Sequence, residues 1–270
     1  MSTLLVCSKS TRKFIMDYEF SEYDRVRIVT SAPTKDILNE VGTEEDVIAI
    51  GGGAVIDTAK ILSKNPIKCY PTTASGSSST SWAVYWDGTK KCSLKRMVPK
   101  EVILNRVFVE DLSDEVIMST TFDVVSHCLD SLFSNKATEK SIKYCEKALN
   151  IIRNKKDNLD LIKAGYIAGK AIEITGTNLL HSLSYPLTGY YNIPHGLALG
   201  YFLPKISNFM GYDISDIIKD FDIKPFDKNI DINFIINEAF NYDKINEFCK
   251  IHPAGFSEKI DKRTLKELYE

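Results

Sequence analysis

Three of the four histidines lie in two segments whose residue types and spacing suit a metal ion. Asp123 and His127 stand four positions apart, which places a carboxylate and an imidazole on one face if the segment is helical. His181 and His195 lie in the later segment HSLSYPLTGYYNIPHG, in which a short loop containing Pro194 separates them. One carboxylate and three neutral imidazoles form a ligand set for a divalent metal such as Fe(II) or Zn(II). The spacing therefore predicts a metal site.

A purely structural interpretation of these residues has to be weighed against the metal site. A single histidine on an apolar helix face is usually a core residue, and Asp123 could instead be a helix-start carboxylate near Ser119 and Thr120. The metal hypothesis is strengthened by two further motifs, both suited to a nucleotide, that come earlier in the chain.

The first of these motifs is the segment DVIAIGGGAVIDTAK at residues 46–60. Its apolar, β-branched start predicts a buried strand, and a tight turn at Gly51, Gly52 and Gly53 then leads into a helix. Glycines let backbone N–H groups approach a phosphate closely, and a helix N-terminus favours negative charge. The motif is neither G-x-G-x-x-G nor a P-loop, and many α/β proteins use such a turn for packing alone.

The second motif is the hydroxyl-rich segment CYPTTASGSSSTS at residues 69–81. A stretch of this composition is often a linker. Here, however, it lies between a predicted strand at 67–70 and the β-rich stretch 82–86. Hydroxyls and backbone amides without a carboxylate suit a pyrophosphate or a nicotinamide ribose, so we expect this loop to contact a cofactor.

Taken in order, four motifs resemble the iron-containing (group III) alcohol dehydrogenase family, which has the dehydroquinate-synthase-like fold. The chain reads GGGAVIDTAK, PTTASGSSST, DVVSHCLD and HSLSYPLTGYYNIPHG. The family pattern is GGGSxxDxAK, PTTAGTGSE, DAxxHAxE and HxxxHPLGxxxxxPHG. The resemblance extends from Arg25 to about Pro204, and residues 241–246 resemble the family's last helices. It implies an α/β nucleotide-binding domain followed by an all-α metal-binding domain.

The resemblance also implies the cofactors and the residues that hold them. Fe(II) or Zn(II) would be bound by the four metal-site residues, and the second cofactor would be NAD(H) or NADP(H). The expected NAD(P) contacts are Gly51, Gly52, Gly53, Asp57, Thr72, Thr73, Ser77 and Lys91. The implied activity is metal-dependent, NAD(P)H-linked interconversion of a small aldehyde and its alcohol. We expect Asp57 and Tyr185 to take part in catalysis.

Several positions depart from the family pattern. Tyr185 stands where the family has the second histidine of HxxxHP, so proton delivery to the alkoxide would use Tyr185 or water. Ser79 replaces the glutamate of GSE, and Asp130 replaces the glutamate that follows the first histidine. No carboxylate follows the predicted strand 27–30 in residues 31–34, so NADPH is allowed as well as NADH.

The SYPLT variant and the stretch WAVYWDGTKKCSLK are similar to the subgroup that reduces phosphonoacetaldehyde to 2-hydroxyethylphosphonate. Cations for a phosphonate would come from Lys90, Lys91, Lys95 and Arg96, although a lysine run is more often a solvated face. Two alternatives stay open. One is a dehydroquinate-synthase-like lyase or cyclase on the same fold. The other is a non-catalytic, degenerate binding protein, because family members are typically longer than this chain.

Composition supports a soluble enzyme. The 270 residues, 44% of them hydrophobic and 26% charged, can form two modest domains. A net charge of −2 indicates no basic surface for nucleic acid. The six cysteines contain no C-x-x-C pair, which favours reduced thiols and a cytoplasmic location. No apolar run reaches ~18 residues, so we expect no signal peptide, no membrane span and no membrane partner.

We expect residues 1–111 to form the α/β dinucleotide-binding domain and residues 112–270 the helical metal-binding and catalytic domain. Strands are predicted at 4–7, 26–30, 47–50, 67–70 and 102–109, with a hairpin of 82–86 and 91–94 that turns at Asp87-Gly88. Helices are predicted at 35–41, 139–152, 161–174 and 232–240, and Ser113 is a predicted N-cap. The active site would lie in the cleft between the domains. We expect a homodimer or larger homo-oligomer, with an exposed N-terminal strand pairing across a two-fold axis.

Overall fold

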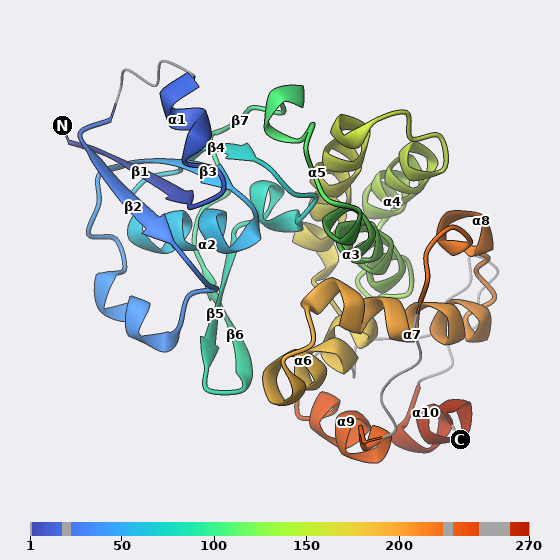
Figure 1. Cartoon of the computed structure of the whole chain (residues 1–270). Coiled ribbons are helices and arrows are strands. Elements are labelled where there is room, and N and C mark those ends of the chain that lie inside the picture. Colours follow the sequence, from blue (N-terminus) through green and yellow to red (C-terminus); the bar gives the residue numbers. More distant parts are fainter. Residues whose placement is uncertain (1, 18–22, 224–228, 243–259, 270) are drawn as a thin grey trace.

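The computed structural model describes residues 2–17, 23–223, 229–242 and 260–269. Its main sheet is parallel, with strand order β2-β1-β3-β4-β7 (Figure 1). The strands are β1 (Thr3–Ser8), β2 (Arg25–Val29), β3 (Asp46–Gly51), β4 (Lys68–Pro71) and β7 (Glu101–Val102). β1 and β3 are continuous apolar runs because both of their faces are buried, as is usual for a parallel sheet.

Each face of the sheet is covered by different elements. Helix α2 (Gly53–Leu62) lies on one face, where Ile56 and Ile61 pack with Val6 and Ala49. On the other face a smaller cluster includes side chains of β1 and β3, and Ile15 of the short helix α1 (Lys13–Asp17) packs against it. Because β3 ends at Gly51 and α2 begins at Gly53, the glycine turn lies at the carboxyl end of β3.

A two-stranded hairpin extends from the sheet toward the helical part of the chain (Figure 1). It consists of β5 (Trp82–Asp87) and β6 (Lys90–Lys95), and Gly88 in its turn has a φ of 59°. A side chain at Gly189 of α6 (Leu179–Tyr191) would place its Cβ 2.2 Å from the carbonyl oxygen of Thr89. The tip of the hairpin thus rests on α6.

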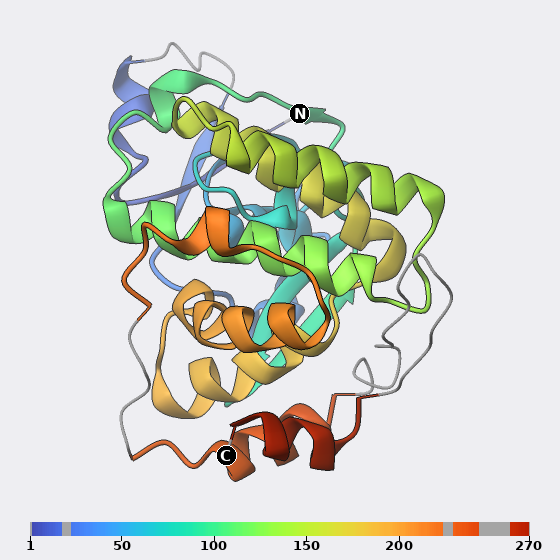
Figure 2. The ribbon, with the colours of Figure 1, turned by 90° about the vertical axis from the view of Figure 1, so that its right-hand side faces the viewer.

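The rest of the described chain is helical (Figure 2). The helices are α3 (Asp114–Leu132), α4 (Glu139–Arg153), α5 (Asn158–Thr175), α6, α7 (His195–Phe209), α8 (Ser215–Ile218), α9 (Ile232–Ala239) and α10 (Lys262–Tyr269). α3 packs against α4, α5 and α7, and its Phe122 is among the largest buried side chains. Ser113 caps α3 as predicted, by accepting the N–H of Val116.

The hydroxyl-rich loop joins the two parts of the molecule. Its 3₁₀ turn η2 (Gly76–Ser79) packs against α5, where glycines leave room for it. A Cβ at Gly165 would lie 2.5 Å from the carbonyl oxygen of Ala74, and one at Gly169 would lie 2.0 Å from Oγ of Ser79. At the end of the loop the backbone N–H and hydroxyl of Ser81 donate to Glu173 of α5, at 2.9 and 2.8 Å. The segment is therefore a fixed part of the structure and not a linker.

The predicted fold class, an α/β part followed by an all-α part, is confirmed. The strand expected at 102–109 is wrong beyond Val102, because β7 pairs only with Lys68 and Cys69 of β4. The chain then forms the 3₁₀ turn η3 (Arg106–Phe108). The predicted helix at 35–41 is the 3₁₀ helix η1 (Lys35–Glu40).

The expectation of an exposed N-terminal strand is also wrong. β1 is hydrogen-bonded to β2 on one side and to β3 on the other, so β2 is the edge of the sheet. Residues 243–246 of the predicted tail lie outside the described residues. Within the described part of the chain, none of the helices is long and apolar enough to cross a membrane.

The close approach of the loop to α5 leads to a stability prediction. Gly165→Ala should destabilise the protein by about 1–3 kcal/mol, because its methyl group would meet the backbone of Ala74 and force the loop away. Chemical denaturation would measure this free energy of unfolding. Lys163→Ala, on an exposed position of the same helix, should change it by less than about 0.5 kcal/mol. A Gly165→Ala variant as stable as the wild type would contradict the packing described here.

Candidate metal and cofactor site

The two metal-ligand candidates of the first segment lie on one helix. Asp123 and His127 are in the middle of α3, so Asp123 is not a helix-start carboxylate and that alternative is wrong. As the spacing predicts, the two side chains share a face of the helix, with 3.5 Å between Asp123 Oδ1 and His127 Nε2.

The other two imidazoles reach the same carboxylate from two further helices. Nε2 of His181, on α6, lies 3.2 Å from Asp123 Oδ1, and Nε2 of His195, the first residue of α7, lies 3.8 Å from it. The His127 and His181 rings are stacked, with 4.6 Å between their centroids. The side chain of His195 is 28% exposed, whereas those of His127 and His181 are buried. The fold therefore brings all four predicted ligands together, with His195 outermost.

The protonation of these groups suits metal binding. Burial lowers the pKa of His127 to about 4 and lowers that of His195 well below its usual range, so both imidazoles are neutral near pH 7. Burial alone would raise the pKa of Asp123, but the nearby imidazoles, His127 first, outweigh it and lower that pKa. The site thus offers an ionised carboxylate and two neutral imidazoles, those of His127 and His195, which are ligand types that fit Fe(II) or Zn(II).

The tautomers of two histidines follow from their partners. Ser184 donates its only hydroxyl proton to the carbonyl oxygen of His181, at 2.7 Å. Its oxygen, 3.2 Å from Nδ1 of His195, must therefore accept a proton from that nitrogen. Nε2 of His195, which faces Asp123, is left with a free lone pair. Nδ1 of His127 has no hydrogen-bond partner among the described residues.

Asp130 is a residue of the site that the sequence marks only as a departure from the family pattern. Its fully buried carboxylate lies 2.8 Å from Nδ1 of His181 and also accepts backbone N–H groups at the start of α6. Burial lowers the pKa of His181, but hydrogen bonds to Asp123 and Asp130 outweigh this effect and raise it. The signal that could have found Asp130 is its position seven residues after Asp123, on the same helix face.

The glycine turn and the hydroxyl loop lie against each other. Gly52 is the N-cap of α2 and supplies no side-chain cap. The N–H of Val55 donates back to the carbonyl oxygen of Gly52 at 3.1 Å, which leaves the N–H groups of Gly53 and Ala54 to face an anion. A Cβ at Gly52 would lie 2.8 Å from Oγ1 of Thr73, and one at Gly53 would lie 3.2 Å from Oγ of Ser75 and 3.4 Å from that of Ser77. These contacts form a cradle of amides and hydroxyls that suits a phosphate.

The other predicted cofactor residues lie around this cradle. A Cβ at Gly76 would lie 3.1 Å from Cε1 of His127, so the loop extends from the glycine turn to the metal ligands. Gly51 ends β3, and its carbonyl oxygen accepts the N–H of Thr72 at 3.1 Å. The predicted phosphate contacts and the predicted metal ligands are therefore neighbours.

Asp57 lies inside the wall of the site. Its Oδ1 is 3.5 Å from Nζ of Lys60, which also donates to the carbonyl oxygens of Thr80 and Trp82. Burial raises the pKa of Asp57 and lowers that of Lys60, while Lys60 and Ser77 favour the ionised Asp57. This buried pair fixes α2 to the start of the hairpin.

Tyr185 and Lys91 lie beside the metal ligands. The ring of Tyr185 is stacked on that of His195 with 6.0 Å between centroids, and its hydroxyl is 3.2 Å from Oγ1 of Thr177. Burial raises the pKa of Tyr185, so its hydroxyl keeps its proton at neutral pH. Nζ of Lys91 lies 4.4 Å from the centre of the Tyr185 ring, because the hairpin places β6 against α6.

The other three cations of the hairpin region lie elsewhere, so the expected cationic cluster is wrong. Lys90 is exposed, and Nζ of Lys95 lies 5.9 Å from the ring centre of Trp82. Arg96 donates to the carbonyl oxygens of Lys60 and Ser63 at the end of α2. Lys90 and Lys91 are neighbours on β6 and point to opposite faces, whereas Lys95 lies four residues further along the strand and Arg96 lies beyond its end.

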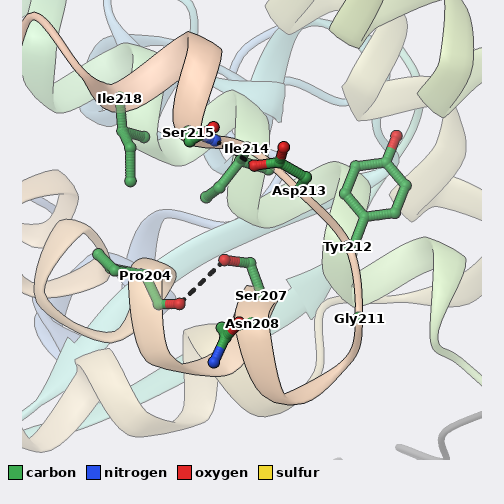
Figure 3. A pocket seen from close by; sticks show the side chains of 9 residues that line it. All are labelled: Pro204, Ser207, Asn208, Gly211, Tyr212, Asp213, Ile214, Ser215 and Ile218. Atoms are coloured by element: carbon green, nitrogen blue, oxygen red, sulfur yellow. Dashed lines mark hydrogen bonds between the residues drawn. The ribbon is translucent and has the colours of Figure 1, made fainter.

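A cavity of about 420 Å³ lies outside this region, at the end of α7 and beside α8 (Figure 3). It is lined by Pro204, Ser207, Asn208, Gly211, Tyr212, Asp213, Ile214, Ser215 and Ile218. None of the predicted ligands or cofactor residues borders it. The chemistry-bearing side chains thus converge between the sheet and the helices and not at this cavity.

Comparison with known proteins agrees with this geometry. Residues 117–223 match the model of the Fe-containing alcohol dehydrogenase family, C-terminal. Maleylacetate reductase 2 of Cupriavidus pinatubonensis is 27% identical over 179 residues, which are 60% of this chain and 50% of the relative. The 1-propanol dehydrogenase of Citrobacter freundii is 28% identical over 192 residues, covering 62% and 52%. The chain spans about half the length of the curated relatives it matches.

Solved structures share the fold over nearly the whole chain. The iron-containing alcohol dehydrogenase of Thermotoga maritima has a TM-score of 0.80 at 20% identity, covering 100% of this chain and 91% of that one. Sulfoacetaldehyde reductase of Bifidobacterium kashiwanohense, solved with NAD⁺, has a TM-score of 0.72 at 18% identity, covering 99% and 90%. The arrangement of the sheet and the helices is therefore that of these solved structures. The helical part of the chain, over residues 117–223, is similar to the C-terminal part of the Fe-containing alcohol dehydrogenase family.

The central position of Asp123 leads to a prediction on metal binding. Asp123→Asn should abolish measurable stabilisation by Zn(II), because it removes the only negative charge shared by the three imidazoles. For the wild type, Zn(II) at 100 times its Kd should add about 2.7 kcal/mol of stability. Thermal unfolding with and without Zn(II) would measure the difference. Asp114→Asn, in the first turn of the same helix, is the control and should keep the zinc effect. Full stabilisation of Asp123→Asn by Zn(II) would contradict this site.

Proposed function

We propose that this protein is a metal-dependent, NAD(P)H-linked alcohol dehydrogenase that reduces a small aldehyde. The observation that carries the proposal is the contact between two sites. The cradle at the start of α2 reaches the metal-ligand cluster through the hydroxyl loop, whose Gly76 lies against His127. A nicotinamide cofactor whose phosphates rest on the cradle can thus extend toward an aldehyde at the metal ligands.

The chain's own residues have distinct roles in this proposal. When bound, the divalent metal supplies Lewis-acid polarisation of the carbonyl oxygen and NAD(P)H supplies the hydride. Asp123, His127, His181 and His195 would hold the metal. Gly51, Gly52 and Gly53, with Thr72, Thr73 and Ser77, would hold the phosphates and ribose. Asp57 would act from the wall of the site by fixing Ser77 and Lys60.

Tyr185 is proposed to move the proton. Its hydroxyl is protonated at neutral pH and is hydrogen-bonded to Oγ1 of Thr177. Its ring is stacked on that of His195. A neutral phenol at this place can donate a hydrogen bond to the oxygen that becomes the alkoxide. The Thr177 hydroxyl can then relay a proton to the phenol. This is the work that the family assigns, by resemblance, to the histidine absent from this chain.

The substrate class proposed here is a small aldehyde with an anionic group, such as phosphonoacetaldehyde. Lys91 supports this class because its ammonium lies above Tyr185, next to the metal ligands. The similarity to sulfoacetaldehyde reductase, named for an aldehyde that carries an anionic sulfonate, points the same way. One cation at this distance can make charge-assisted hydrogen bonds to a phosphonate. NADPH stays open beside NADH as the cofactor.

The direct test is NAD(P)H oxidation by protein loaded anaerobically with Fe(II) or Zn(II), against a panel of aldehydes. We expect metal-dependent oxidation that His195→Ala abolishes, because the outermost ligand is lost. Tyr185→Phe should lower kcat by about 10²–10⁴-fold and leave metal binding unchanged, since it removes only the proton donor.

Two results would contradict the proposal. Stoichiometric metal without oxidation of NAD(P)H by any aldehyde would favour the lyase or cyclase alternative. A chain that binds neither metal nor nucleotide would favour the non-catalytic alternative.

The role of Tyr185 has a separate outcome. Activity of Tyr185→Phe equal to that of the wild type would assign the proton transfer to water.

The anionic substrate class has its own test. Lys91→Met should lower kcat/KM for phosphonoacetaldehyde about 10–100-fold more than it lowers kcat/KM for propanal. This factor corresponds to the free energy of one charge-assisted hydrogen bond. Lys95→Met, on the same strand but beside Trp82, is the matched control and should change neither. Equal losses with both aldehydes, together with a raised KM for NAD(P)H, would place Lys91 on the cofactor alone.

A further inference from the structure

Asp130 is a buried carboxylate that the proposed reaction does not use directly. It lies on α3, seven residues after Asp123, and its side chain is fully buried. Burying an ionised group is costly unless hydrogen bonds compensate for the lost water. The contacts of this carboxylate therefore indicate what it does.

Four N–H groups converge on Asp130. Its Oδ2 accepts the backbone N–H of Asn178 at 2.7 Å and that of His181 at 3.3 Å, and its Oδ1 accepts that of Leu180 at 2.9 Å. The fourth contact is Nδ1 of His181, 2.8 Å from Oδ2. Because Oδ2 accepts two backbone N–H groups and so acts as an acceptor here, we place the proton of this contact on Nδ1.

The three backbone contacts replace a missing helix cap. Asn178 is at the N-cap position of α6, but its side chain makes no capping hydrogen bond. Asp130 supplies that cap from another helix and places its negative charge at the N-terminus of α6, where the helix dipole favours it. α3 and α6 are thereby joined at the point where α6 presents His181.

We infer that Asp130 is the positioning residue for His181, which it holds as a ligand whose free lone pair is on Nε2. This role rests on the proposed metal site. With Nδ1 bound to Asp130, Nε2 is the ring nitrogen that faces Asp123, 3.2 Å away, and it is the nitrogen available to a metal. A histidine backed by a carboxylate is also a more basic ligand than one backed by a neutral group.

The three imidazoles differ in what backs them. His181 has the carboxylate of Asp130, and His195 has the neutral hydroxyl of Ser184. Nδ1 of His127 has no partner among the described residues. Through Asp123, His127 and Asp130, one face of α3 thus supplies two ligands and orients a third. Of the three, His181 is the imidazole that a buried carboxylate holds in place before any metal binds.

The test compares Zn(II) binding by the wild type with that by Asp130→Asn. The four N–H donors share two carboxylate oxygens in the wild type, whereas an asparagine side chain offers them one oxygen. At least one donor therefore loses its acceptor, and the negative charge beside Nδ1 of His181 is lost. We expect the Kd for Zn(II), measured by competition with a chelator, to rise about 10–100-fold. Asp130→Glu, which keeps the charge, should bind Zn(II) more tightly than Asp130→Asn.

A matched control separates this role from helix capping. Asp157 caps α5 by accepting the N–H of Asp160, far in sequence from the predicted metal ligands, so Asp157→Ala, which removes this cap, should lower stability without changing the Kd for Zn(II). NMR of the Zn(II)-loaded protein, labelled with ¹⁵N-histidine, gives a readout that capping does not affect. The Nδ1 proton of His181 should exchange slowly in the wild type and rapidly in Asp130→Asn.

These readouts do not depend on aldehyde reduction, so failure of the proposed reaction would be seen separately. An unchanged Kd and an unchanged Nδ1 proton in Asp130→Asn would overturn the positioning role. If Asp130→Asn does not fold, an Asp130→Glu variant that binds Zn(II) with wild-type affinity and keeps the Nδ1 proton would support it, and one that lacks both would overturn it. Absence of Zn(II) binding by the wild type would overturn the metal site and this role together.

Discussion

The convergence of three imidazoles on one carboxylate is the constraint on which the rest of the site depends. Asp123 Oδ1 is within 3.8 Å of Nε2 of His127, His181 and His195, which come from three different helices. Three helices can meet at one oxygen only if their backbones approach closely. Gly196 and Gly200 of α7 allow this, since a Cβ at Gly196 would lie 2.2 Å from the carbonyl oxygen of Ser119.

The same principle operates at the boundary between the two parts of the molecule. Gly165 and Gly169 of α5 let the hydroxyl loop lie on the helix, and Gly189 of α6 lets the hairpin do the same. Hydrogen bonds from the loop to Glu173 of α5, and from Lys60 of α2 to the loop, then hold the closely packed segments in place. Because the interior is close-packed, these contacts hold the glycine turn and the hydroxyl loop at a fixed distance from the four predicted metal ligands. The site is therefore a property of the interface between the two parts.

The charged and titratable groups of the site also constrain one another. The buried groups are not independent, since Asp123 and Asp130 lie on either side of the His181 ring and Lys91 lies near His195 and Tyr185. Each buried charge has an opposite charge or several donors beside it, as the cost of burial requires. The departures from the family pattern fall within this network. Tyr185 brings a neutral phenol where a histidine would titrate, and Asp130 is a shorter carboxylate than glutamate.

The elements with strong local signals could be predicted from the chain's residues alone. Apolar β-branched runs predicted β1 and β3, and the capping serine at 113 predicted where α3 begins, because these features act within a few residues of the chain. The i, i+4 spacing of Asp123 and His127 was enough to place both on one helix face, because residues so spaced are neighbours on any α-helix. The motif order, by resemblance, also named His181 and His195 as partners of that pair.

Which residues meet when they are distant in sequence became visible in the folded chain and not before. The expected strand at 102–109 ended at Val102 because its partner β4 offered no further pairing, which no local pattern reveals. The role of Asp130 was hidden because its donors lie about fifty residues away, at the start of α6. For the same reason the lysine run gave no sign that Lys91 would lie over Tyr185 and Lys95 over Trp82. Contacts between distant segments depend on how helices and strands pack, and packing is a property of the whole chain.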